Sequence, residues 1–184
     1  MKDFKNVMID LETLGTVPGS VILSIGAVAF DEGQPESLWD QFEARPIKVR
    51  SSRAVGLTID EGTLAWWMHQ DAEARGLLDC ALEGAGGLTV HEAMSEFSDW
   101  FPLDACIWGN GANFDEPLLT AAYSAIGCVP PYKYYVSHCY RTMKNLFRNV
   151  PTPAFQGLKH DALADALHQT RHLQAILLHT WAVR

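Results

Sequence analysis

Two carboxylates near the start of the chain have the type and spacing of a cation-binding pair. Asp10 and Glu12 lie two residues apart in the segment VMIDLETLG, so on an extended strand their side chains would point to the same face. Two like charges beside an apolar segment are unfavourable unless a cation lies between them. Carboxylate oxygens suit Mg²⁺ or Mn²⁺, and two such ions about 4 Å apart promote in-line displacement at phosphorus. The pair therefore predicts metal-assisted chemistry on phosphates.

Two further acids could complete such a site. Asp115 lies in WGNGANFDEPLL, in the first turn of a predicted helix, where the helix dipole also favours a carboxylate. Asp165 lies five residues after His160 in KHDALADALHQT. Each acid taken alone is more typical of a solvated surface. Four carboxylates together would balance the charge of two divalent ions, which predicts a site for two Mg²⁺ or Mn²⁺ ions.

Neighbouring residues leave alternatives open. Asp161 competes with Asp165, because both can lie on one helical face with His168 and His172. These two histidines, four residues apart, could themselves bind a metal, but an exposed helix face is the favoured interpretation. Two basic runs, over residues 45–53 and 141–148, could hold phosphates, although charged runs are usually just solvated.

The elements that must position these residues follow from the apolar pattern. Residues 7–13, 21–30 and 38–44 predict three strands with short connections, which form an antiparallel meander. Capping-box spacings predict helices that begin near Thr58, with Glu61, and near Thr89, with Glu92. Residues 104–111 predict a fourth, buried strand, 113–127 a helix, and 161–181 a last helix. We expect an α/β fold, with a mixed sheet flanked by helices on both faces.

Composition limits the class of protein. The chain has 184 residues, of which 48% are hydrophobic, and this suits one domain over residues 1–184 with a sizeable core. No apolar run is long enough to span a membrane, and the first residues have no signal-peptide pattern. The four cysteines form no CxxC pair, which favours reduced thiols in the cytoplasm over a zinc site. The net charge of −8 argues against a generally basic surface that coats nucleic acid.

Three motifs in order give the sequence a resemblance to a known family. IDLET at the first strand, NFD after a buried strand and H-x-x-x-x-D in a late helix resemble the motifs of the DEDDh, or DnaQ-like, 3′–5′ exonucleases, which have an RNase H-like fold. The segment TLAWWMHQDAEAR also looks like a compact branch found in phages and bacteria. The resemblance implies that Asp10, Glu12, Asp115 and Asp165 are metal ligands and that His160 is the general base.

Several other residues are candidates for substrate contacts. Family members grip the terminal nucleotide just after the acidic pair, which implies such a role for Thr13 and Leu14, and Leu11 lies between the two acids. One of the adjacent residues Trp66 and Trp67 could stack on a base, although both could equally belong to the core. Asn110 and Asn113 could orient Asp115 or touch a nucleotide, and turn formation is the alternative.

These observations lead to one expected function with two alternatives. We expect a metal-dependent 3′–5′ exonuclease that releases nucleoside 5′-monophosphates from the 3′ end of single-stranded DNA. An exoribonuclease or oligoribonuclease on the same scaffold is the first alternative, because the sequence does not reveal contacts to the 2′ position. A non-catalytic nucleic-acid-binding accessory module is the second. The expected partner is nucleic acid, without a membrane and with a homodimer left open, in the cytoplasm of a bacterium or of a phage-infected host cell.

Overall fold

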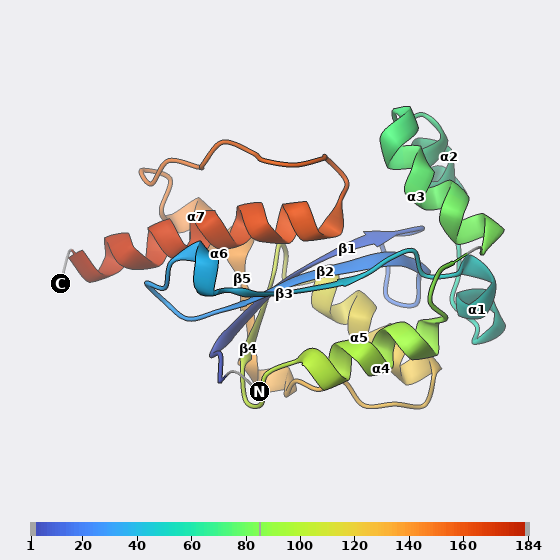
Figure 1. The fold of residues 1–184 in the computed structure, drawn as a ribbon, viewed down its shortest axis with the longest axis horizontal. Coiled ribbons are helices and arrows are strands. Elements are labelled where there is room, and N and C mark those ends of the chain that lie inside the picture. Colours follow the sequence, from blue (N-terminus) through green and yellow to red (C-terminus); the bar gives the residue numbers. More distant parts are fainter. Residues whose placement is uncertain (1–2, 85, 183–184) are drawn as a thin grey trace.

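The computed structural model describes residues 3–84 and 86–182, and its centre is a five-stranded mixed sheet (Figure 1). The strands lie in the order β3-β2-β1-β4-β5. Their bounds are β1 (Asn6–Thr13), β2 (Ile22–Phe30), β3 (Asp40–Ala44), β4 (Cys106–Gly109) and β5 (Ser137–Cys139). The first three strands form the predicted antiparallel meander, and β4 and β5 add in parallel to β1. The predicted sheet class is therefore confirmed.

Seven helices accompany the sheet in the described part of the chain. They are α1 (Val49–Ala54), α2 (Glu61–Met68), α3 (Ala72–Glu83), α4 (Val90–Trp100), α5 (Asp115–Ala125), α6 (Tyr140–Leu146) and α7 (Ala162–Ala182). Short 3₁₀ turns cover Glu36–Leu38 and Tyr134–Val136. Because the first of these turns includes Leu38, β3 begins two residues later than predicted. Figure 1 shows α6 and α7 on one face of the sheet and α4 and α5 on the other. No helix in the described ranges is long and apolar enough to cross a membrane.

Alternation along β1 divides the core into two layers. Val7, Ile9 and Leu11 belong to the larger apolar cluster, which includes residues of α4 and α5. Met8 belongs to the smaller cluster, which includes Tyr140 of α6 and residues of α7. Since strand side chains alternate between faces, Asp10 and Glu12 continue the Met8 row toward α7.

One of the two predicted helix caps is confirmed. At the start of α4, the Glu92 N–H donates to the Thr89 hydroxyl oxygen at 3.2 Å, and the Thr89 N–H donates to the Glu92 carboxylate at 2.7 Å. The cap predicted at Thr58 is wrong, because the Thr58 backbone bonds Gly19 and Val21 in a short parallel bridge. Asp60 instead caps α2 by accepting the Thr63 N–H at 2.7 Å.

A glycine allows α7 to begin directly on the sheet. Gly26 of β2 lies opposite Asp10 of β1. A Cβ atom at Gly26 would lie only 2.2 Å from the carbonyl carbon of Ala162 and from the nitrogen of Leu163. The first turn of α7 therefore touches the backbone of β2 beside the acidic pair.

Candidate active site

Most of the predicted site residues line one cavity of about 640 Å³. Among its lining residues are the predicted positions Asp10, Leu11, Glu12, Thr13, Trp66, Asn110, Asp115, His160 and Asp165. The remaining lining residues are Thr16, Asp60, Gly62, Thr63, Trp67, Phe114 and Arg141. The cavity therefore collects side chains from β1, α2, α5, α6 and α7 and from the loop before α7.

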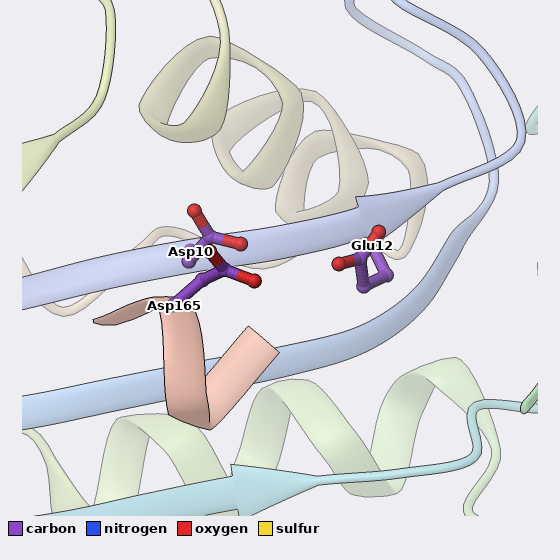
Figure 2. A group of neighbouring side chains, drawn as sticks. All are labelled: Asp10, Glu12 and Asp165. Carbon is purple, nitrogen blue, oxygen red and sulfur yellow. The ribbon is translucent and has the colours of Figure 1, made fainter. Parts of the chain in front are cut away.

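Three carboxylates in this cavity are close enough to share a cation. Ligand oxygens of Asp10, Glu12 and Asp165 all lie within 4.8 Å of one another. Figure 2 shows Asp10 and Glu12 along β1, with Asp165 approaching from the first turn of α7. All the donor atoms are carboxylate oxygens, which is the chemistry that Mg²⁺ and Mn²⁺ prefer.

Asp115 is the fourth acid and is buried, with 1% of its surface exposed. It begins α5, and its Oδ2 accepts the Asn110 N–H at 2.9 Å. A Cβ atom at Gly109 would lie 3.0 Å from the same oxygen, so a glycine at the end of β4 leaves room for this carboxylate. Asp115 lies outside the three-carboxylate group, but its charge contributes to raising the pKa of Asp10.

The pKa values of all four acids are raised, by burial in every case and also by neighbouring acids for Asp10 and Glu12. Burial, and then the charges of Asp115, Glu12 and Asp165, raise the pKa of Asp10 well above its ordinary value. Burial and the neighbouring acids raise the pKa of Glu12 to about 8. Burial raises the pKa of Asp115 to about 6, although backbone N–H groups oppose the shift. Burial also raises the pKa of Asp165. The acids lack a nearby positive charge that would stabilise their ionised forms, and a bound divalent cation would supply it.

His160 lies on the loop that leads into α7 and has a left-handed backbone conformation, with φ of 61°. Its backbone bonds the Asp165 carboxylate. Its ring meets Trp66 edge to face, with centroids 4.9 Å apart, and lies 6.2 Å from the ring of Trp67. Two aromatic rings and one acid therefore hold His160 at the cavity wall.

The adjacent tryptophans have different surroundings. Trp67 is 1% exposed, and its indole N–H donates to the Thr13 carbonyl at 2.9 Å. Trp66 is 44% exposed and lines the cavity. Trp67 thus fixes α2 against the end of β1, while the partly exposed Trp66 lines the cavity.

Two predicted contact residues lie away from this cavity. Leu14 is fully buried in the larger core. Asn113 lines a second cavity of about 330 Å³, whose wall also includes Phe114 and Arg141 of the main cavity. Asn110, by contrast, lies at the main cavity, and its backbone N–H donates to Asp115.

The structure also separates the competing acids of the last helix. Asp161 caps α7 by accepting the Ala164 N–H at 2.9 Å, and its other oxygen pairs with Arg45. It does not belong to the three-carboxylate group among the described residues. Asp165, one turn further along, faces Asp10 instead (Figure 2).

Gln169 is a site residue that the sequence analysis missed. Its side-chain amide donates to Asp10 Oδ1 at 2.7 Å, and only 4% of its surface is exposed. The signal was its position four residues after Asp165, which places both side chains on one face of a helix. Gln169 therefore orients Asp10 from the same helix that carries Asp165.

The predicted exposed face for His168 and His172 is wrong. His172 is 1% exposed, with Nδ1 2.8 Å from the Tyr140 hydroxyl and Nε2 3.3 Å from the Val150 carbonyl oxygen. His168 is half-buried, and burial followed by nearby positive charge lowers its pKa. His172 lies under α6, which packs on α7, and the ring of His168 contacts Phe155, so this pair does not form a surface metal site.

Comparisons with known proteins relate the chain to nucleases. The family described as the 3′-5′ exoribonuclease Rv2179c-like domain matches residues 5–177. A relative from Enterobacteria phage T4, named exodeoxyribonuclease, is 26% identical over 123 residues, which are 61% of this chain and 52% of the relative. The chain therefore matches about half the length of that curated relative.

A solved structure has the same fold. It is the nuclease domain of 3′hExo, a DEDDh family member, bound to rAMP, and it superposes with a TM-score of 0.64 at 14% identity. The match covers 96% of this chain and 92% of that one. The expected RNase H-like class of fold is confirmed at this level.

Proposed function

Because the chain belongs to the family of Rv2179c-like 3′–5′ exoribonuclease domains, of the DEDDh type, we propose that it removes nucleotides from the free 3′ end of a single strand. The observation that carries the proposal is the meeting of Asp10, Glu12, Asp115, Asp165 and His160 at one cavity. A binding module has no need of four acids gathered at one cavity, so the non-catalytic alternative is disfavoured.

Single-stranded DNA is our first candidate substrate, and RNA is the second. The relative from phage T4 is named an exodeoxyribonuclease, which supports DNA. The family description names exoribonucleases and spans almost the whole chain, which supports RNA. Discrimination depends on contacts to the 2′ position of the sugar, so the two substrates must be compared directly.

The acids are proposed to hold two divalent cations, Mg²⁺ or Mn²⁺. Asp10, Glu12 and Asp165 supply the closely spaced oxygens, and Asp115 supplies the fourth carboxylate. Bound ions of this kind lower the pKa of water and neutralise charge that develops on phosphate and leaving oxygens. Gln169 donates to Asp10 Oδ1 and so leaves the other oxygen of Asp10 free to face the cavity.

His160 is proposed as the general base. It accepts a proton from the water that attacks the terminal phosphodiester. The bond between phosphorus and the 3′ oxygen of the shortened strand breaks, and a nucleoside 5′-monophosphate leaves. The exposed ring of Trp66, beside His160, is placed to stack on the terminal base. The edge-to-face contact with Trp66 would link base stacking to the position of the imidazole.

A comparison of labelled oligonucleotides tests the proposal. DNA and RNA strands of one sequence, labelled at the 5′ end, are incubated with Mg²⁺, Mn²⁺ or EDTA. We expect a ladder that shortens one nucleotide at a time, its loss in EDTA, and slow cleavage when a phosphate blocks the 3′ end. Immediate release of the label as a mononucleotide would contradict the direction. Degradation in EDTA would contradict the metal requirement.

A further inference from the structure

The second cavity, next to the active site, shares Arg141 and Phe114 with it. Arg141 is the only lysine or arginine among the described residues that lines the main cavity. Its guanidinium Nε lies 3.5 Å from the Asn110 side-chain oxygen, and its charge lowers the pKa of Asp115. Arg141 therefore stands at the boundary between the acidic cavity and its neighbour.

The second cavity is suited to an anionic chain. Its wall consists of Gly111, Ala112, Asn113, Phe114, Cys139, Arg141, Thr142 and Asn145, and it includes no aspartate or glutamate. Asn113, Thr142 and Asn145 are exposed side chains that can donate hydrogen bonds. Because they lie around one arginine, they offer a neutral and positive surface directly beside the acids.

A second arginine extends this surface just beyond the end of α6. Arg148 is exposed, and its Nε donates to the Asn145 carbonyl at 3.1 Å. Neither Arg141 nor Arg148 has an ion-pair partner within residues 3–84 and 86–182. Their charges are thus available to phosphates, in contrast to Arg45, which pairs with Glu43 and Asp161.

The side of the active site at His160 is less suited to a polyanion. A cavity of about 400 Å³ there touches His160, but Asp71, Glu73 and Asp161 line it together with Arg45 and Lys159. Like charges would repel phosphates at that side, and the Arg45 charge is already neutralised by acids.

From this asymmetry, and resting on the proposed exonuclease function, we propose that the substrate strand leaves the active site along α6. The phosphates on the 5′ side of the scissile bond would bind first at Arg141, in the second cavity, and then at Arg148. Asn113 and Asn145 would contact the sugar–phosphate backbone between them. The molecule would thus hold a strand of several nucleotides despite its net negative charge.

Steady-state kinetics with substrates of two lengths test this path. KM is measured for a dinucleotide and an octanucleotide, in DNA and in RNA, at salt concentrations from 50 to 200 mM. Loss of one phosphate contact to a single strand should reduce the slope of log KM against log salt by about 0.7. For Arg148→Ala we expect this reduction with the octanucleotide, so that the advantage of the longer substrate over the dinucleotide shrinks.

Two further variants complete the experiment. Lys5→Ala removes an equal charge from the exposed surface just before β1, outside both basic runs, and should keep the wild-type slope. Lys159→Ala tests the cavity of about 400 Å³ that also touches His160. The proposed path is overturned if Arg148→Ala keeps the wild-type slope, or if Lys159→Ala is the variant that loses it, while the wild type still degrades the octanucleotide. A wild type that degrades neither substrate would overturn the proposed function itself.

Discussion

Replacement of Glu12 by glutamine should stabilise the metal-free protein at neutral pH. Glu12 is 9% exposed, and burial and neighbouring acids raise its pKa from 4.5 to about 8. In the unfolded chain this carboxyl ionises above about pH 4.5, whereas in the folded chain it stays protonated to about pH 8. The contribution of Glu12 to stability is therefore fully present below pH 4.5 and is lost as the pH rises toward 8.

The size of this effect follows from the shift. Each pH unit between the unfolded and folded pKa values costs about 1.4 kcal/mol, so the loss at pH 7 is roughly 3 kcal/mol. Glutamine keeps the shape of the side chain and does not titrate. In a chain of this length that difference corresponds to about 6–12 °C in melting temperature. The value is an upper bound, because the other acids share the repulsion.

Thermal unfolding followed by circular dichroism, in EDTA from pH 4.5 to 8, measures this difference. The melting temperatures of wild type and Glu12→Gln should be similar at pH 4.5 and should separate in favour of the variant as the pH rises. Glu36→Gln is the matched control, because a hydrogen bond from Arg171 lowers the pKa of Glu36, so that loss of this charge should destabilise the protein near neutrality. The reasoning would be refuted if the melting temperatures of the wild type and of Glu12→Gln changed in parallel up to pH 8.

Three other changes have defined outcomes. Gly26→Ala should lower kcat about a hundredfold. The added Cβ atom would lie 2.2 Å from Ala162, and relief of this contact would move α7, and with it Asp165, by about 1 Å. Steady-state measurement of kcat and KM tests this loss. His160→Ala should lower the rate about 10²- to 10⁴-fold with metal affinity retained, as rates measured at saturating Mg²⁺ would reveal. Asp115→Asn should abolish turnover but raise the melting temperature in EDTA, since it removes one buried charge.

Local patterns predicted the strands and the acidic pair. Strand alternation alone put Asp10 and Glu12 on one face, and the meander followed from short connections between apolar runs. The Thr89 cap was readable for the same reason, because a capping box lies within four residues. Features that depend on contacts between distant parts of the chain could not be predicted from the sequence. Thr58 failed as a cap because its backbone bonds the loop after β1, far away in sequence.

The roles of residues on the last helix, and the presence of the shortest elements, also depended on tertiary packing. The contrast between Asp161, which pairs with Arg45, and Asp165, which faces Asp10, exists only once α7 lies on the sheet. His172 looked like a surface residue because its cover, α6, has only seven residues and no clear period. The helix α1, with six residues, was missed for the same reason, and β5, with three, is defined only by its pairing with β4.

The contact of α7 with Gly26 links the assembly of the proposed metal site to the order of synthesis. Asp10 and Glu12 belong to β1, whereas Asp165 and Gln169 belong to α7, which is synthesised much later. A nascent chain that has not yet exposed α7, or a fragment cut in the loop before it, has the acidic pair without its partners. A break before His160 would also remove the proposed general base, so neither premature termination nor cleavage ahead of this residue would release an active nuclease.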